Sequence, residues 1–426
     1  MVIYQRGGDI VRIIVTNVKM INSLDLALNS KVMTFIGEQA SGKSTIAKIV
    51  FLAHFFPRLL SLYAINLMSF SQKVDLSLQG FQKEFERCIR ERMPGVETGS
   101  IVFAYSNDTL KATAIFTKKE VKVDFNEALS KRVNDYISTF AAGARNSKAL
   151  FEGGVFSVDD FEIDEDVCAP FYIPAGRGAL LSISEQIQGS RMIPSQDEFA
   201  LGYIRSSVAY KHIFKSNAST IQKWRNSSRP EKRRLFELLS IVLKGGYEQD
   251  STGNEFLRVE GKNELVEVRN ASSGQQEILY PILFLLDEII HPRKRRLIIF
   301  EEPEAHLHPK SQKAIVELIA YVANHSPSRF LITTHSPYIL SAFNPLILSG
   351  QIEKKGSRNP IVYPEYRLVK NTVAAYSLTL DSSFAKKINC DDGTIDATDI
   401  DTASDVLNDQ IYALMGKQSI RGDNDA

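Results

Sequence analysis

The sequence has few cysteines and no excess of charge of one sign. Its three cysteines, Cys88, Cys168 and Cys390, lie far apart and lack C-x-x-C spacing. Neither a disulfide framework nor a zinc cluster is therefore indicated. Lys and Arg number 51 against 50 Asp and Glu, a net charge of +1. No global field favours nucleic acid or a membrane, so any such surface has to be local.

Long hydrophobic segments, heptads and repeats are also missing. The longest uncharged apolar stretch, Leu59 to Gln72, is too short for a bilayer, which takes about 20 residues. Met1 to Arg12 has no apolar h-region, so we expect no signal peptide. No heptad pattern lasts several turns, and no solenoid period is found. We expect a soluble, cytoplasmic α/β protein of one large or two smaller domains.

What the sequence does contain is a phosphate-loop motif, GEQASGKST, preceded by the β-prone run Val32–Ile36 and followed by a helical pattern. A phosphate loop requires this strand–loop–helix setting, because loop N–H groups and the helix N-terminus face the phosphates. Lys43 can reach the β- and γ-phosphates, and the Ser44 hydroxyl can bind Mg²⁺. The chain is predicted to bind and hydrolyse ATP. The candidate binding residues are Gly37, Glu38, Ala40, Ser41, Gly42, Lys43, Ser44 and Thr45.

A second apolar run, Leu297 to Phe300, ends in two carboxylates, Glu301 and Glu302. Such a run suits a central parallel strand, and active groups of these sheets sit at the strands' carboxyl ends. Glu301 can hold Mg²⁺, and Glu302 can orient or deprotonate the attacking water. A strand ending in merely exposed acids is the alternative, which the phosphate loop disfavours.

Three histidines that follow the acid pair in the sequence are considered as site residues. His335 comes directly after the apolar run Phe330–Thr334 and could contact the γ-phosphate and the attacking water. A lone histidine there is usually structural, so its candidacy rests on the phosphate loop and the acid pair. His306 and His308 could suggest a metal, but no third ligand is nearby. A loop contact or a helix start at Pro309 is preferred for them.

The rest of the chain supplies the organisation of the protein. We expect the phosphate-loop helix to end before Pro57, and the turn after the strand Phe171–Ile173 to present Arg177. The predicted elements include strands at Val11–Val15 and Leu24–Leu28 with a turn at Asn22-Ser23, an antiparallel meander over Ser100–Phe125, and a basic helical stretch over Arg205–Arg234. The predicted segments are 1–200 (N-terminal ATPase lobe), 201–254 (basic helical lobe), 255–348 (C-terminal ATPase lobe) and 349–426 (C-terminal extension).

Four motifs in order resemble the ABC-type ATPases: the phosphate loop, Ser272-Ser273-Gly274-Gln275-Gln276-Glu277, Glu301-Glu302-Pro303-Glu304 and Thr334-His335-Ser336. The chain is most similar to the soluble branch with the SMC heads and OLD proteins. More narrowly it resembles the ATPase subunits of two-gene anti-phage systems such as PARIS and Septu. The resemblance implies a P-loop ABC-type head with an antiparallel β subdomain and a helical lobe. It also implies a head-to-tail dimer in which Ser272, Ser273, Gly274 and Gln275 of one subunit cap the ATP held by the other.

The chain departs from that pattern in several places. Glu301 replaces the usual aspartate, and Ser273 stands where many members have glycine. The place of the Q-loop glutamine is assigned to the Pro174–Arg177 turn. Arg177 itself is interpreted either as a phosphate or subunit contact or as a structural salt bridge. The long SMC arm and the OLD nuclease domain are missing, and Asp391–Asp401 does not fit a calcium loop.

Two functions compete. In the first, ATP-driven assembly controls an effector, a nuclease or toxin from a neighbouring gene, in anti-phage defence. In the second, the stretch Arg205–Arg234 grips DNA during repair or chromosome maintenance. That basic stretch and the acidic segment Asp391–Asp409 could instead join subunits or dock the effector. A nuclease with its own site is disfavoured because no second carboxylate cluster is recognisable, and a transporter subunit because of the large insertions before Ser272.

Overall fold

The computed structural model describes residues 11–69, 77–146, 163, 167–178, 180, 198–250, 252–259, 261–262, 264–292, 295–352, 360–379 and 385–396. The predicted last helix near Ala403–Met415 and the acidic residues beyond Asp396 lie outside them.

A six-stranded sheet with the order β14-β13-β3-β12-β11-β7 forms the centre of the protein. All neighbours in it are parallel except β13 and β14. In β11, Leu297 and Ile299 enter one hydrophobic core, whereas Ile298 and Phe300 enter the other. Burial on both faces explains the uninterrupted apolar runs and confirms the predicted strands. The strands are β3 (Val32–Gly37), β7 (Ala169–Ile173), β11 (Arg296–Glu301), β12 (Arg329–Thr334), β13 (Val373–Leu378) and β14 (Lys386–Lys387).

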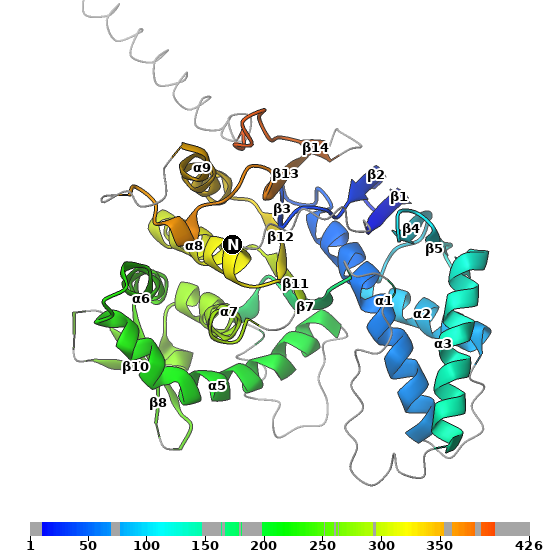
Figure 1. The fold of residues 1–426 in the computed structure, drawn as a ribbon, viewed down its shortest axis with the longest axis horizontal. Coiled ribbons are helices and arrows are strands. Elements are labelled where there is room, and N and C mark those ends of the chain that lie inside the picture. The colour runs from blue at the N-terminus through cyan, green and yellow to red at the C-terminus, as the bar shows by residue number, and fades with distance from the viewer. Residues whose placement is uncertain are drawn as a thin grey trace, which may run out of the picture.

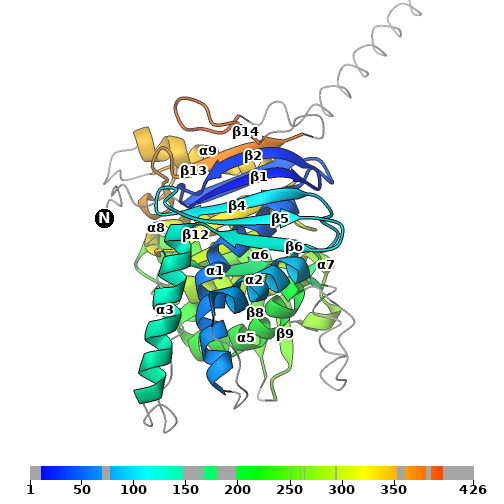
Figure 2. The ribbon, with the colours of Figure 1, turned by 90° about the vertical axis from the view of Figure 1, so that its right-hand side faces the viewer.

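One face of this sheet is covered by α1 (Lys43–Ser69), and a second sheet lies beyond α1 (Figure 2). This second sheet is antiparallel, with the order β2-β1-β4-β5-β6. Its alternating residues pack on α1, as the predicted meander requires. The layer consists of β1 (Arg12–Val18), β2 (Ile21–Ala27), β4 (Gly99–Tyr105), β5 (Leu110–Phe116), β6 (Val121–Phe125), α2 (Leu78–Arg92) and α3 (Glu127–Asn146).

Helices and a small sheet cover the opposite face of the central sheet (Figure 1). The predicted basic stretch, Arg205–Arg234, is helical apart from a short turn and packs on this layer, with Trp224 in its core. The layer contains α5 (Glu198–Arg225), α6 (Pro230–Leu243), α7 (Ser273–Ile290), α8 (Pro309–His325), α9 (Pro337–Ile352) and the sheet β10-β9-β8, formed by β8 (Gly245–Gln249), β9 (Glu255–Val259) and β10 (Leu265–Glu267).

Two local predictions were wrong. Helix α1 does not end before Pro57 but continues to Ser69. Proline removes the helical donor to the carbonyl of Ala53, and the Tyr105 hydroxyl donates to that carbonyl instead at 2.7 Å. The turn assigned to Asn22-Ser23 falls earlier, at Lys19-Met20, and both residues lie inside β2.

Helix α1 also explains an apolar segment of membrane-like length. Lys43–Ile65 is long and apolar enough to cross a bilayer by length and composition alone. Of its most apolar window, however, 72% is buried inside the protein, between the two sheets. Its hydropathy is that of a core helix.

Candidate nucleotide-binding site

The phosphate loop lies at the carboxyl end of β3, where α1 begins with Lys43. Gly42 has a φ of +94°, and Ala40 has a φ of +61°, so the loop curls through the left-handed region. A Cβ on Gly37 would lie 2.1 Å from the carbonyl oxygen of Leu378, which closes this position to any side chain. Strand β13 thereby fixes the path of the loop. The sequence analysis did not predict this strand.

Lys43 points back into the loop. Its Nζ donates to the carbonyls of Gly37 and Glu38, at 2.8 and 2.7 Å, and lies 3.3 Å from Ser41 Oγ. The residue is 6% exposed. Burial lowers the pKa of Lys43 to about 8, although Glu302 and Glu304 oppose this shift. The loop therefore holds a cation whose hydrogen bonds phosphate oxygens can replace.

Glu301 and Glu302 occupy different environments at the end of β11. Glu301 is 6% exposed; its Oε2 accepts from Ala175 N at 3.3 Å, and its buried Oε1 has no hydrogen-bond partner among the described residues. Glu302 has a φ of +44° and a side chain that is 36% exposed. Its N–H donates to the Thr333 carbonyl at 2.8 Å. One carboxylate thus faces inward, and the next is open to solvent.

His335 lies between Lys43 and Glu302. Its Nδ1 is 3.5 Å from Lys43 Nζ, and its Nε2 is 3.5 Å from Glu302 Oε1. An ammonium can only donate, so the neutral tautomer that fits has its proton on Nε2, towards Glu302. The fold therefore brings together three residues that the sequence analysis selected from separate motifs.

Glu304 is a site residue that the sequence analysis did not select. Its Oε1 accepts from the backbone N–H of His335 at 2.6 Å, and in the part of the chain that the structure describes its buried Oε2 has no hydrogen-bond partner. Burial raises the pKa of this carboxyl group. Glu304 fixes the start of the segment that carries His335. Its position directly after Glu301-Glu302-Pro303 is the sequence feature that could have identified it as a site residue.

The signature-like residues begin α7. Ser272 is the N-cap: its Oγ accepts from Gln275 N, and the Gln275 side chain accepts from Ser272 N, which forms a capping box. A Cβ on Gly274 would lie 2.5 Å from the His306 carbonyl oxygen. Ser272 and Ser273 are exposed. Among the described residues, no hydrogen bond joins Ser272–Gln275 to Gly37–Thr45.

Two further expectations can be compared with the structure. Arg177 is not presented by its turn but is fully buried, with its Nε 3.4 Å from Glu277 Oε2. Of the two interpretations of Arg177, the structure thus supports the structural salt bridge. His308 is the N-cap of α8, with Pro309 in the first turn, as preferred over a metal ligand. Within the described ranges, no cluster of three or more His, Cys, Asp or Glu could hold a metal.

The chain nevertheless has oxygen atoms that fit Mg²⁺. Mg²⁺ is held by one or two protein oxygens together with substrate phosphates, and it needs no all-protein cage. The unpartnered Oε1 of Glu301 is a buried carboxylate oxygen of this kind. Ser44, in the first turn of α1, is exposed at the loop. Glu301 and Ser44 are thus chemically suited to the ion.

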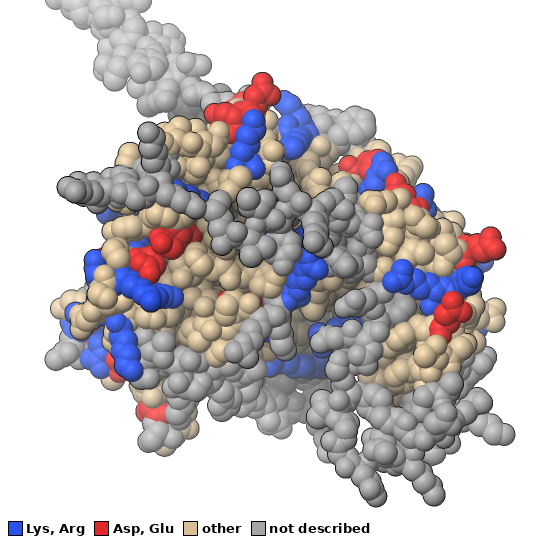
Figure 3. Space-filling view, viewed as in Figure 1, with Lys and Arg blue, Asp and Glu red and all other residues tan. Residues whose placement is uncertain are grey.

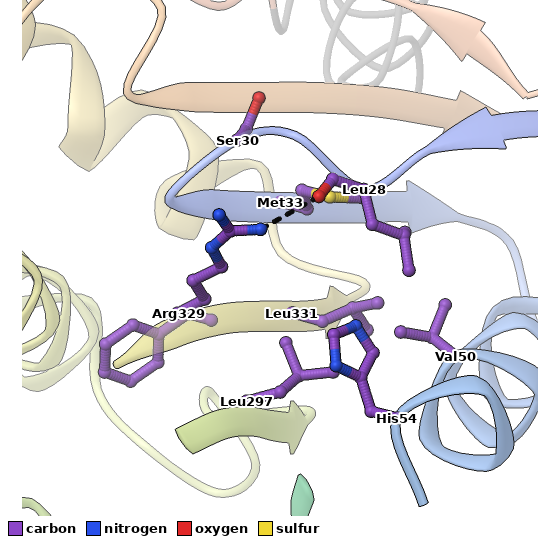
Figure 4. Close-up of a pocket in the computed structure, with 9 residues that line it drawn as sticks. Leu28, Ser30, Met33, Val50, His54, Leu297, Arg329 and Leu331 are labelled. Carbon is purple, nitrogen blue, oxygen red and sulfur yellow. Dashed lines mark hydrogen bonds between the residues drawn. The ribbon is translucent and has the colours of Figure 1, made fainter. Parts of the chain in front are cut away.

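A small cavity at the amino ends of the strands does not belong to this site (Figure 4). It measures about 10 Å³ and is lined by Met33, His54, Arg329 and neighbouring apolar residues. Arg329 donates to the Leu28 carbonyl at 3.1 Å. The cavity has room for about one water molecule, not for a nucleotide.

Comparison with known proteins adds a family match. Residues 183–341 match the family described as "AAA domain, putative AbiEii toxin, Type IV TA system". This range covers less than half of the chain and leaves out the phosphate loop. Protein ea59 of Escherichia phage lambda is 23% identical over 159 residues, 35% of this chain. The match spans 29% of ea59, under a third of that protein's length.

Solved structures of SMC heads are also similar. The Smc head domain with an extended coiled coil bound to the C-terminal domain of ScpA, derived from Pyrococcus furiosus, is 11% identical with a TM-score of 0.41. The alignment covers 94% of this chain and 99% of that one. The SMC head domain from Thermotoga maritima is 12% identical with a TM-score of 0.39, over 90% and 99% of the two chains. Both TM-scores lie below 0.5.

The class of the protein follows from its sheet and its family match. A mostly parallel sheet carries a phosphate loop and an acid pair at its carboxyl edge, and an antiparallel sheet and a helical layer flank it. The family match, over residues 183–341, covers the part of that arrangement that carries the acid pair. The fold is that of an α/β P-loop ATPase head. Membership of a PARIS- or Septu-type system stays a prediction.

Proposed function

We propose that this protein binds and hydrolyses ATP in head-to-tail dimers and that its assembly controls a separately encoded effector, in anti-phage defence. The observation that carries the ATPase proposal is the contact of Lys43 and Glu302 with the two ring nitrogens of His335. Through His335, the cation proposed to bind phosphate, Lys43, is linked to the carboxylate that is open to solvent, Glu302.

In this proposal the phosphates of ATP take the place of the loop carbonyls around Lys43. Loop N–H groups and the start of α1 bind the same oxygens. Glu302, the open carboxylate, orients and deprotonates the attacking water, and His335 directs its Nε2 proton towards Glu302 and so orients that carboxylate. Ser44 and Glu301 would hold Mg²⁺, which supplies charge neutralisation at the phosphates.

The dimer is proposed because the phosphate loop and the start of α7 would each supply half of a shared ATP site. Ser272 and Ser273 are exposed at a helix N-terminus, where backbone N–H groups favour an anion. Within the chain they make no hydrogen bond to the described loop at Gly37–Thr45. A second copy in a head-to-tail arrangement would supply the missing half, so ATP would act as the bridge between subunits.

Control of a partner is supported by the matched family, whose description names a toxin and a type IV TA system. The corner between α5 and α6 exposes Lys223, Arg225, Arg229 and Arg233. On the face shown in Figure 3, Lys/Arg occur in separate groups, some beside Asp/Glu and some without them. An acidic protein surface would be attracted to this corner in a salt-dependent way.

The test is to co-express the chain with its neighbouring gene product and to purify it with and without ATP. A charge-reversed variant changes Lys223, Arg225 and Arg229 to Glu. The matched control reverses Lys118, Lys119 and Lys122, which are exposed near the β5–β6 turn. We expect a partner that depends on ATP and is lost only with the first variant.

Binding of DNA is the competing function, and the same proteins test it. If no partner copurifies, while DNA stimulates ATP hydrolysis in the parent but not in the first variant, the maintenance function replaces effector control. Absence of ATP hydrolysis in the parent under all conditions would contradict the ATPase proposal itself.

A further inference from the structure

Arg177 has no role in the chemistry above, yet it is fully buried and donates to four carbonyl groups. Its Nε bonds to Glu277 O at 3.0 Å. Its Nη1 bonds to Pro174 O at 2.8 Å and to Glu301 O at 2.6 Å, and its Nη2 bonds to Glu302 O at 3.0 Å. The guanidinium carbon lies 5.2 Å from the centre of the Phe300 ring. A single side chain thus holds the last three residues of the acid-bearing segment.

The contact with Glu302 is the informative one. Glu302 has a φ of +44°, a conformation that a residue with a side chain adopts only when its surroundings impose it. Its N–H is held by the Thr333 carbonyl at 2.8 Å, and its carbonyl is held by Arg177. Both peptide groups beside the Glu302 Cα are thereby fixed. The side chain is turned out of the strand towards His335, 3.5 Å away.

Arg177 also connects this turn to α7, the helix that Ser272 caps. Glu277, on α7, accepts from the N–H groups of Arg177 and Gly178 at 2.9 and 3.0 Å. The position of Glu302 is thus tied to α7 through two residues that are both buried. An arginine that bound phosphate would not be expected to make these contacts with Glu277 and Glu302.

We propose that Arg177 is a positioning residue for the reaction. It holds the backbone of Glu302 in the conformation that aims the carboxylate at the attacking water, and it anchors this conformation to α7. The inference rests on the proposed ATPase function. A lysine would keep the charge but would lose the planar fork that reaches carbonyls in several directions.

The test compares Arg177→Lys with Arg296→Lys. Arg296 is a matched control because it joins β11 to α7 at the opposite end, with its guanidinium over Phe284 and bonded to Glu288. For Arg177→Lys we expect kcat to fall at least about tenfold while the Kd for ATP changes less than about threefold. Arg296→Lys should lower the Tm to a similar degree and leave kcat within about twofold.

A double mutant separates positioning from a general structural effect. If Arg177 acts through Glu302, adding Arg177→Lys to Glu302→Gln should lower the remaining rate by less than about twofold. An equal loss in both backgrounds, or an unchanged kcat in Arg177→Lys, overturns the inference. Should Arg177→Lys not fold, Glu277→Gln is measured by the same criteria. Parent protein without turnover contradicts the ATPase proposal, whereas normal turnover in Arg177→Lys contradicts only this inference.

Discussion

Glu302 and His335 lie 3.5 Å apart, Oε1 to Nε2, although 32 residues separate them in the chain. The strands that precede them, β11 and β12, are parallel neighbours whose carboxyl ends meet at one edge of the sheet. The next strand, β3, brings Lys43 to the other side of the histidine. In the proposed mechanism, binding and hydrolysis use separate residues of this arrangement, which substitutions can distinguish.

Glu302→Gln should bind ATP and hydrolyse it at least about a hundredfold more slowly, because only the base for the water is removed. Lys43→Ala should lose ATP binding itself, since the cation at the phosphates is gone. Binding of a fluorescent ATP analogue and phosphate release measure the two properties. Equal hydrolysis by Glu302→Gln and the parent would rule out this carboxylate as the base.

Sites shared between subunits predict complementation. Ser272→Arg should block hydrolysis but leave ATP binding to the monomer, because in the proposed dimer this residue caps the other subunit's nucleotide. An equal mixture with Lys43→Ala should recover about one quarter of the parent rate, since half of the dimers are mixed and each has one intact site. Mixed dimers that form, by native mass spectrometry, and stay inactive would exclude sharing.

The affinity for ATP should fall in alkali. Burial lowers the pKa of Lys43 to about 8, and only the protonated amine binds phosphate strongly. The Kd for a non-hydrolysable analogue should therefore rise about tenfold between about pH 7.5 and about pH 9. Lys43→Arg serves as the control, because its guanidinium stays charged and should give a flatter profile. A flat profile for the parent would show that the ammonium stays protonated.

Acid should destabilise the protein through His54. Burial first, and Arg329 second, lower the pKa of this histidine from 6.5 to about 3, and its Nδ1 accepts from Cys168 N at 3.0 Å. The unfolded chain binds a proton on His54 below about pH 6.5, and the folded chain binds it only near pH 3. The contribution of neutral His54 to the unfolding free energy is therefore complete above pH 6.5 and is lost as the pH falls.

At pH 5 the loss should be about 2 kcal/mol of unfolding free energy. The matched variant is His54→Asn, whose Oδ1 can accept the same hydrogen bond without titrating. Urea unfolding at pH 7.5 and pH 5 should show a smaller acid loss in the variant. The same loss in both proteins would assign the effect to other groups.

The helix through Pro57 offers a test of packing. Tyr105→Phe should cost about 1–2 kcal/mol, because the buried Ala53 carbonyl then has no donor. In a Pro57→Ala background the same change should cost less, since residue 57 regains an N–H for that carbonyl. Additive losses in the urea-unfolding cycle would show that the hydroxyl and the proline are not coupled.

The local sequence predicted the parts of this protein that depend on neighbours along the chain. The runs before Gly37 and Glu301 are apolar without alternation because both faces of their strands are buried, and the meander alternates because it packs on one face. The start of α8 at Pro309 follows in the same way from local capping chemistry. In these segments the spacing of the apolar residues matches the repeat of the backbone, so the pattern identifies the element.

Tertiary structure alone decided how those parts meet. Lys43, Glu302 and His335 come together only because β11, β12 and β3 are adjacent, and strand order depends on packing across the whole chain. Arg177 was open to two interpretations because its turn gives no sign of the carbonyls that surround it. Pro57 continues a helix because a tyrosine 48 residues away supplies the missing donor. The sequence by itself thus determined the strands that precede the phosphate loop, the acid pair and His335, together with the candidate chemistry. Long-range burial and hydrogen bonding decided which residues face each other.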